Sequence, residues 1–418
     1  MARYAKIFII GVFLVLLASL AVCGYDKAGV DKAGSDSVLY EQLEYFGEAI
    51  NILRTEYVEP VDSKKLVHGA MRGMLSGLDD YSQFLEKEEY EELESDAKGE
   101  FGGLGLEIAM KGGMLTVITP IDGGPAEKSG IKPGDRIVKI DGKATEEIGI
   151  NEAVKMMRGE PGTTATLSIW REKSDKVFDA SIRRAVIKVR SIKSAELVDG
   201  KIGYIKLVEF QENTPRDLDI ALKKLESQGL IALVLDLRNN PGGLLDAAAA
   251  VCERFLQEGA VVVSIKTRDP KNDTVYRSGG KFAHRNFPMM ILVNGGSASA
   301  AEVFAGAMQD NKRALIIGTR TFGKASVQTV EGLRDGTALR FTSAYYYTPK
   351  GRLIKKEGIM PDVVIDRNGS VMEKGIKTPP EESGKTDDED ILSRDKDEQL
   401  KMAIGLLKAL KVYGENNE

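Results

Sequence analysis

The segment that decides the fold is residues 290–308, which read MILVNGGSASAAEVFAGAM. The apolar run 290–293 predicts a buried strand, and 300–308 has the composition of a helix. Between them, small residues place Ser299 at the start of the helix, where its hydroxyl is accessible and the first backbone N–H groups are unpaired. This strand, turn and helix indicate an α/β fold with Ser299 as a candidate nucleophile.

The same alternation of strands and helices extends over the surrounding sequence. Near-continuous apolar strands between helices are typical of a layered α/β domain with a largely covered sheet. Ser299 follows a strand end, where open α/β sheets place their sites. We expect strands at 202–205, 232–237, 261–265, 290–293 and 315–317, and helices at 214–227, 245–255 and 300–308.

A serine hydroxyl needs a base to accept its proton, and histidine is the usual one. The chain has two histidines, His68 in a helical N-terminal region and His284 in a polar connector, and neither lies in a motif that pairs it with a serine and a carboxylate. A lysine serves as the base when burial lowers its pKa, because desolvation disfavours the ammonium form. Lys324, twenty-five positions after Ser299, is the candidate.

Lys324 also invites a second interpretation. It ends the sequence GTRTFGK (318–324), which follows an apolar strand as a phosphate-binding loop does. Such a loop continues with Ser or Thr as a magnesium ligand and then with a helix. Here Ala325 follows, and 326–330 has the pattern of a strand, so a nucleotide site is disfavoured.

Glu302, three positions after Ser299, and Gln328, four positions after Lys324, complete a set of four residues. This set resembles the signature of the carboxyl-terminal processing peptidases, a Ser-Lys serine protease family, and the resemblance extends from about residue 40 to 365. It implies that Ser299 is the nucleophile, Lys324 the general base and Gln328 the group that orients the lysine. It also implies a crotonase-like core that needs no metal or organic cofactor. Ala301 stands where many members have a serine, which leaves this chemistry untouched.

The loop DLRNNPGG (236–243) is a second candidate part of the site, because a strand end that runs into glycines lets backbone N–H groups approach a ligand closely. The resemblance implies that the N–H groups of Gly243 and Ala300 form the oxyanion hole, where a donor is worth about 3 kcal/mol. A plain turn at a helix N-terminus is the alternative. We expect Asp236–Arg238 to be a structural pair and Glu302 to support the site through hydrogen bonds.

Residues 96–186 read as short strands with one helix, a pattern similar to a PDZ domain. In its Gly103-Leu104-Gly105-Leu106 loop, N–H groups at glycine positions form a nest for a terminal carboxylate. The adjoining strand edge and helix form a groove in which a peptide adds as an extra strand, so we expect this module to bind C-termini. In the family, an arginine near the end of the groove helix couples peptide occupancy to the protease, and Arg158 matches it. A surface arginine is the alternative.

At the N-terminus, basic residues precede sixteen apolar positions from Ile7 to Val22. This run is short for a membrane span, so residues 1–25 predict an export signal or a signal anchor and a mature chain in the periplasm or cell envelope. Residues 20–23 resemble a lipoprotein cleavage box ending in Cys23, although valine is larger than the usual residue before the cysteine. An uncleaved anchor is the alternative. Cys252 is the only other cysteine, so we expect it in the core without an intrachain disulfide.

Outside the two main domains the sequence predicts linkers and helices. Residues 26–36 are polar and contain glycine, which favours a linker. The resemblance implies that the helical region 37–95 serves in assembly, so we expect a homo-oligomer. The C-terminal part 367–418 reads as an acidic linker and a final amphipathic helix that makes a packing or oligomer contact. Its apolar positions are Leu400, Ile404, Leu407 and Leu410.

These patterns predict an exported serine endopeptidase with a PDZ domain and a Ser-Lys core at 187–366. With 418 residues, the chain has room for about three domains. Its net charge of −5 and pI near 5.5 give no excess of basic residues for binding nucleic acid. The expected partners are proteins or peptides with exposed C-termini, an adaptor lipoprotein, and the membrane through the N-terminus.

Two other classes of protein are disfavoured. An inactive scaffold that only holds C-termini would not need the intact Ser299, Lys324 and Gln328. An acyl-CoA-transforming enzyme would share the core architecture, but the PDZ module and the export signal favour a peptide substrate.

Overall fold

The structure is a computed structural model that describes residues 27–172, 176–280, 286–371 and 396–415. It divides into two compact units, Met1–Leu78 and Asp79–Glu418. The predicted signal segment 1–25 with Cys23, the connector residue His284 and the acidic linker lie outside the described residues. No described helix combines the length and the apolar character that a bilayer span requires.

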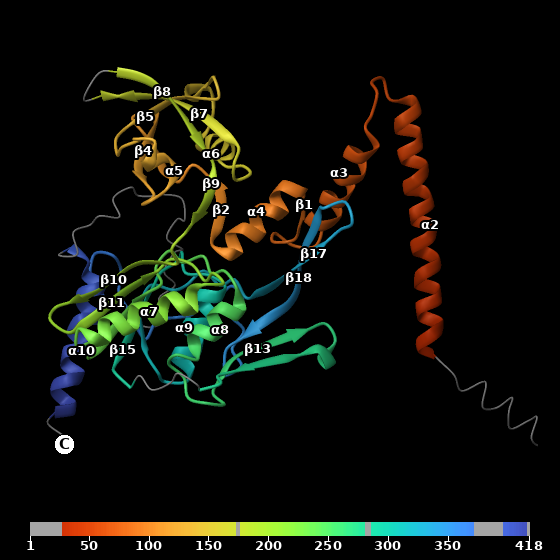
Figure 1. Cartoon of the computed structure of the whole chain (residues 1–418). Coiled ribbons are helices and arrows are strands. Elements are labelled where there is room, and N and C mark those ends of the chain that lie inside the picture. Colours follow the sequence, from red (N-terminus) through yellow and green to blue (C-terminus); the bar gives the residue numbers. More distant parts are fainter. Residues whose placement is uncertain (1–26, 173–175, 281–285, 372–395, 416–418) are drawn as a thin grey trace, which may run out of the picture. The chain divides into compact units, whose positions relative to one another are not determined.

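The first unit contains two helices, α2 (Lys27–Glu56) and α3 (Ser63–Ser76), and the second of these carries His68 (Figure 1). Asp62 is the N-cap of α3, since its side chain accepts the N–H of Lys64 at 2.8 Å. The prediction of a linker at 26–36 is wrong for residues 27–36, which form the first turns of α2. This segment has no proline, and its two glycines are outnumbered by alanine and charged residues that tolerate a helix.

The second unit begins with β1 (Gln83–Leu85) and α4 (Lys87–Lys98), and continues into a small antiparallel sheet of order β3-β4-β5-β7-β8. In this order β3 (Leu106–Lys111) is an edge strand. The predicted groove helix is present as α6 (Ile150–Met157). The remaining elements are β2 (Glu100–Gly103), β4 (Met114–Pro120), α5 (Pro125–Lys128), β5 (Arg136–Ile140), β6 (Lys143–Ala144), the 3-10 helix η1 (Thr145–Glu147), β7 (Thr164–Arg171), β8 (Lys176–Arg183) and β9 (Ala185–Lys188).

The rest of this unit is built on a six-stranded sheet of order β10-β11-β12-β15-β16-β19. From β11 to β19 all neighbouring strands are parallel, so the carboxyl ends of β12, β15 and β16 lie at the same edge of the sheet. The strands are β10 (Ile192–Val198), β11 (Ile202–Leu207), β12 (Ala232–Asp236), β15 (Met289–Val293), β16 (Leu315–Gly318) and β19 (Val363–Val364).

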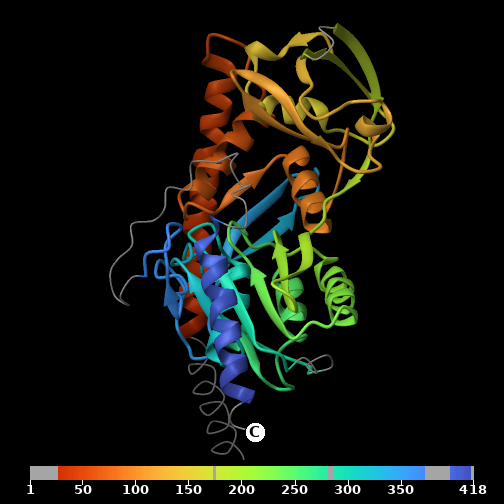
Figure 2. The same ribbon diagram turned by 90° about the vertical axis from the view of Figure 1, so that its left-hand side faces the viewer.

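Helices cover both faces of this sheet, which confirms the predicted layered α/β fold. One face packs against α7 (Thr214–Ser227), α8 (Leu245–Cys252) and α9 (Ala300–Asp310), and Cys252 is fully buried in that core as predicted. The other face packs against α10 (Glu398–Glu415), the blue helix in front of the strands in Figure 2. The predicted C-terminal helix therefore has a packing role. It contributes Leu400, Ala403 and Leu407 to that second core.

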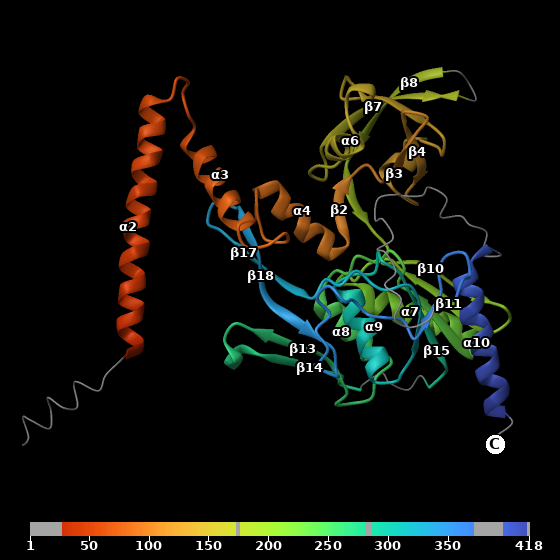
Figure 3. The ribbon, with the colours of Figure 1, turned by 180° about the vertical axis from the view of Figure 1, so that it is seen from behind.

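Strand β13 (Val261–Thr267), expected as a strand of the layered domain, does not join the six-stranded sheet. It pairs antiparallel with β14 (Thr274–Arg277) and with β18 (Ala338–Tyr347), and β17 (Ser326–Gly332) pairs with β18 in turn (Figure 3). The short 3-10 helix η3 (Pro270–Asn272) connects β13 to β14. An apolar run marks a strand, but its partners depend on register and long-range contacts that the run does not encode.

The packing of α10 gives a first prediction. Leu400→Ala should lower the free energy of unfolding by about 2–4 kcal/mol, because the Leu400 side chain is 3% exposed and its truncation leaves a cavity under α10. Urea denaturation followed by circular dichroism measures the change. Leu410→Ala is the matched control on the same helix, because Leu410 is 49% exposed, and it should change stability by less than about 0.5 kcal/mol. Equal destabilisation by both variants would contradict the described packing.

Candidate active site

Ser299 occupies the turn between β15 and α9, as its sequence predicts. Its backbone has φ 52° and ψ −116°, a conformation that L-residues rarely adopt. Ser297 fixes the turn, because its Oγ donates to the Leu237 carbonyl at 2.8 Å and accepts the Asn294 N–H at 3.0 Å. The strained turn holds a half-buried serine where the parallel strands end.

The loop after β12 packs directly against this turn. A Cβ added at Gly242 would lie 2.8 Å from Ser299 Cβ and 2.9 Å from the Ala300 nitrogen, so no side chain fits there. Asn240 holds the loop in place, because its Oδ1 accepts the Gly242 N–H and its backbone oxygen accepts the Ala298 N–H, each at 2.9 Å. Glycine is therefore required for the close approach of the two backbone segments.

The two predicted oxyanion donors belong to these adjacent segments. Gly243 has φ 115°, and a Cβ there would lie 2.2 Å from the Phe210 carbonyl oxygen. Ala300 is the first residue of α9, where backbone N–H groups lack intrahelical partners. Among the described residues, the N–H groups of Gly243 and Ala300 have no hydrogen-bond acceptor. Both donors are thus available to a ligand beside Ser299.

Glu302 connects the serine turn to the lysine loop. Its side chain is 0% exposed, and its carboxylate accepts four hydrogen bonds. Burial raises the pKa of Glu302, while the four donors act in the opposite direction by stabilising the ionised form. The supporting role predicted for Glu302 is confirmed. The donors are the N–H groups of Ser299 (2.9 Å), Gly323 (2.7 Å) and Lys324 (2.9 Å) and the Thr321 hydroxyl (2.5 Å).

Lys324 lies in the loop between β16 and β17, with its side chain half-buried. Its ammonium is 5.1 Å from the centre of the Tyr81 ring and makes no hydrogen bond or ion pair with any described residue. Burial lowers the pKa of Lys324, the positive charge of Arg340 lowers it further, and Glu302 opposes both. A lowered pKa is the shift that a lysine needs to act as a general base.

Gln328 lies on β17, four residues after Lys324. Its Nε2 donates to the Thr342 hydroxyl at 2.8 Å, while its Oε1 is buried and has no partner among the described residues. A buried acceptor without a donor is costly and often marks a functional position. The Lys324 ammonium therefore lacks an acceptor among the described residues. Four residues later, on β17, the Gln328 Oε1 lacks a donor among them.

Asp236 and Arg238, at the end of β12, form the predicted structural pair. The Arg238 guanidinium donates to both carboxylate oxygens of Asp236, from Nε to Oδ1 at 3.0 Å and from Nη2 to Oδ2 at 2.6 Å. Burial by itself raises the pKa of Asp236, but Arg238 and Lys206 outweigh it and hold that pKa at about 2. Arg238 also contacts the start of α10, which the sequence did not predict.

Three family descriptions match the chain: peptidase family S41 at residues 201–365, a PDZ domain at 116–171, and the N-terminal domain of the activating protease CtpB at 21–89. A carboxy-terminal-processing protease of Bartonella bacilliformis is 44% identical over 373 residues, which cover 88% of this chain and 83% of that protein. This chain belongs to the carboxy-terminal processing proteases. It is a serine-type peptidase with a PDZ domain.

Two further carboxy-terminal processing proteases resemble the chain over most of its length. CtpA of Bacillus subtilis is 33% identical over 415 residues, covering 98% of this chain and 86% of that protein. The solved photosystem II D1 C-terminal processing protease is 34% identical, covers 77% of this chain and 86% of its own, and has a TM-score of 0.47.

The PDZ domain of this carboxy-terminal processing protease contains the predicted carboxylate loop. Gly103 pairs with Ala185 at the end of β2, and the Leu104 side chain is buried in the core of the domain. Gly105 has φ 74°, which favours glycine at this turn. Leu106 is the first residue of the edge strand β3. The loop therefore leads straight into the edge strand of this sheet.

Arg158 caps the end of α6, as expected for the groove helix. Its guanidinium forms an ion pair with Glu92, lies 3.7 Å from Asp96, and stacks over the Phe101 ring at 4.7 Å. Glu92 and Asp96 both belong to α4. Arg158 thus connects the groove helix to the helix that precedes the PDZ domain.

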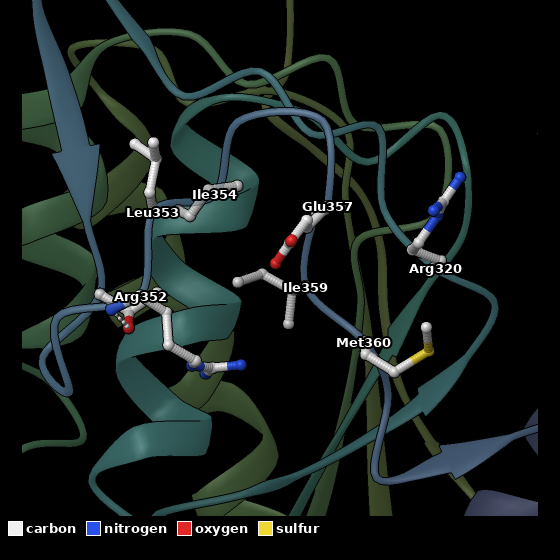
Figure 4. Close-up of a pocket in the computed structure, with 9 residues that line it drawn as sticks. Arg320, Arg352, Leu353, Ile354, Glu357, Ile359 and Met360 are labelled. Atoms are coloured by element: carbon white, nitrogen blue, oxygen red, sulfur yellow. Dashed lines mark hydrogen bonds between the residues drawn. The ribbon is translucent and has the colours of Figure 1, made fainter. Parts of the chain in front are cut away.

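A pocket of about 250 Å³ lies beside the lysine loop, between Arg320 and the segment 348–360 (Figure 4). One lining residue, Ile359, accepts the Thr321 N–H at 3.2 Å and donates its own N–H to the Thr321 hydroxyl at 2.6 Å. Neither Ser299 nor Lys324 lines this pocket. The pocket is therefore separate from the residues that the sequence predicts for the site.

Sequence reasoning missed several residues that build the site. Thr321 carries no motif of its own, and its role follows only from its contacts with Glu302 and Ile359. Asn239 and Asn294 join their loops, since the Asn294 side chain accepts the Asn239 N–H and donates to Asn239 Oδ1, each at 2.8 Å. The one available signal was that both asparagines belong to glycine-containing segments that follow predicted strands, with Asn294 directly before Gly295 and Asn239 three positions before Gly242.

The strained backbone of Ser299 gives a second prediction. Ser299→Gly should be more stable than Ser299→Ala by about 1 kcal/mol, because glycine adopts φ 52° without steric strain. Urea midpoints of the two variants measure the difference. Ser343, in β18, is the matched control, since its φ is not positive and glycine there should be less stable than alanine. A Ser299→Ala protein that is the more stable would show that the turn is unstrained.

Proposed function

We propose that this carboxy-terminal processing protease is an exported endopeptidase that cleaves peptide bonds by a Ser-Lys mechanism. The observation that carries the proposal is the shared carboxylate: Glu302 accepts the N–H of Ser299 and the N–H of Lys324, each at 2.9 Å. The nucleophile and the base are therefore held by one buried group. The layout is also consistent with a crotonase-like core, in which a strand end and a helix start frame the oxyanion hole.

The proposed chemistry uses this chain's own groups at each step. Neutral Lys324 takes the proton from Ser299 Oγ as the oxygen attacks the scissile carbonyl carbon. The oxyanion that forms is stabilised by the N–H groups of Gly243 and Ala300. Protonated Lys324 gives its proton to the leaving amine as the C–N bond breaks, and a water hydrolyses the acyl-serine with Lys324 again as the base.

Gln328 has an orienting role in this proposal. Its Oε1 is the buried acceptor that lacks a donor, and Lys324 carries the ammonium that lacks an acceptor. A hydrogen bond between them would satisfy both groups and hold Nζ in one position. Tyr81, beside the ammonium, helps to exclude water from it.

The PDZ domain is proposed to select substrates by their C-termini. The edge of β3 offers unpaired backbone groups for an added strand, and Gly105 opens the loop that would receive the carboxylate. Leu106, Ile108 and Ile150 are partly buried apolar residues of this domain and favour an apolar C-terminal side chain. Arg158 is proposed to report peptide occupancy through its contact with α4.

The cellular setting is also a proposal. Residues 1–25 support export, with the mature chain in the periplasm or cell envelope and attached to the membrane through a retained anchor or a lipid on Cys23. Protein or peptide substrates with exposed C-termini, an adaptor lipoprotein and a second copy of the chain are the proposed partners. The first unit favours self-association, since Leu43, Phe46 and Leu53 are all exposed on α2.

The third prediction tests the Ser-Lys pair. Ser299→Ala and Lys324→Ala should each abolish cleavage of an unstructured protein with an apolar C-terminus, followed by mass spectrometry. In the parent, kcat/KM should rise with pH along a limb whose midpoint lies below 10.5, the ordinary lysine value, because burial lowers the pKa of Lys324. Lys223→Ala is the control, as Lys223 is exposed on α7. If the lysine and serine variants cleave like the parent, the assigned pair is wrong.

The fourth prediction concerns Gln328. Gln328→Glu should move the rising limb of the pH profile upward, because a carboxylate beside Lys324 stabilises the ammonium form and raises its pKa. Gln328→Ala should lower kcat about 10- to 100-fold with the limb displaced less, since the base is only misoriented. Gln257→Glu, at an exposed position, controls for added charge. An unchanged limb in Gln328→Glu would mean that Gln328 does not contact the base.

A further inference from the structure

The first turn of α10 reaches the loop that carries one of the proposed oxyanion donors. Arg238 Nη1 and Nη2 donate to the two carboxylate oxygens of Asp397, at 3.0 and 2.7 Å. Gln399 accepts a third hydrogen bond from Arg238 at 3.0 Å on Oε1 and donates to the Ile365 carbonyl at 2.8 Å on Nε2. The contact is bidentate and shielded, because Arg238 is 16% and Asp397 20% exposed.

The start of α10 adds a second carboxylate to this cluster. Asp236 and Asp397 supply two negative charges, and Arg238 and Lys206 supply two positive charges. Lys206 also donates to the Arg238 carbonyl at 2.6 Å, so both the side chain and the backbone of Arg238 form hydrogen bonds within the cluster. Removal of Asp397 takes away one of the two carboxylates that pair with the Arg238 guanidinium.

The backbone around Arg238 is part of the framework that positions the proposed site. The Leu237 carbonyl accepts the Ser297 hydroxyl at 2.8 Å, within the turn that presents Ser299. Asn240 accepts the Gly242 N–H at 2.9 Å, one residue before Gly243. Any shift of Arg238 is therefore passed to both the serine turn and the donor at Gly243.

We infer that Asp397 and Gln399 are positioning residues, through which α10 holds the oxyanion loop in its productive geometry by way of Arg238. This inference rests on the proposed function of Gly243. It assigns a catalytic consequence to a helix outside residues 201–365, the part of the chain that matches the peptidase family. Neither residue touches the reacting atoms, so their effect is on transition-state stabilisation and not on peptide binding.

Asp397→Asn in the full mature chain is the variant that tests the inference. Asp397 is also the residue that caps α10, because its Oδ1 accepts the Leu400 N–H at 3.0 Å. Asparagine is an equally good N-cap, so the helix remains capped while the charge and the bidentate contact are lost. Glu398→Gln is the matched control on the same turn, since Glu398 pairs with Lys401 at 2.7 Å and is 42% exposed.

Three measurements on these variants are informative. In Asp397→Asn, kcat should fall about 10- to 100-fold with KM unchanged. Affinity for a peptide aldehyde, whose serine adduct carries the oxyanion, should fall by the same factor, while affinity for the matching peptide amide stays constant. Amide hydrogen exchange of residues 237–243 should accelerate. Glu398→Gln should match the parent in all three, and Asp397→Glu should recover part of the lost kcat.

Two results would overturn the inference. One is equal kcat and equal exchange at 237–243 in Asp397→Asn and Glu398→Gln. The other is a fall in kcat in Asp397→Asn together with an equal loss of affinity for the peptide amide and an unfolding midpoint as low as that of Leu400→Ala. That result would indicate that packing of α10 is lost. Failure of the proposed function is distinct, because the parent itself would then neither cleave nor bind the aldehyde. Even in that case, the comparison of hydrogen exchange at 237–243 tests whether Asp397 holds the loop through Arg238.

Discussion

The site depends on one buried carboxylate. Glu302 is fully enclosed, and the four hydrogen bonds it accepts come from two segments that are far apart along the chain, the serine turn and the loop 321–324. A buried carboxylate is stable only when donors compensate its lost hydration, so both segments must be present for either to be stable. The carboxylate that joins these two segments of the fold is thus also the group that fixes the proposed nucleophile relative to the proposed base.

The parallel sheet makes this arrangement possible. Because β12, β15 and β16 are neighbours with the same direction, the loops that follow them emerge at one edge. Close approach then requires residues without side chains, as at Gly242, and a strained backbone at Ser299. The buried core under α7, α8 and α9 stabilises the fold enough to keep that strain.

The opposite face of the sheet contributes to the same loops. Helix α10 packs on it through Leu400 and Leu407 and reaches Arg238 with its first turn. The second sheet has a comparable role for the proposed base, since β17, which follows Lys324, is fixed by its pairing with β18. Each functional loop is therefore held from two sides, by its own strand and by an element from elsewhere in the chain.

The sequence by itself determined the central strands and helices of the core and the identity of the candidate residues. Apolar runs mark β11, β12, β15 and β16, and small residues around Ser299 and at Gly242 and Gly243 mark the turns, because these are local properties of the chain. The contacts of Glu302 with Thr321, of Asn239 with Asn294 and of Arg238 with Asp397 were decided only by the tertiary structure. The same holds for β13, whose apolar run predicted a strand but not its antiparallel partners. Hydrogen bonds between distant polar side chains leave no periodic trace in a sequence, since they depend on which strand ends the fold brings together.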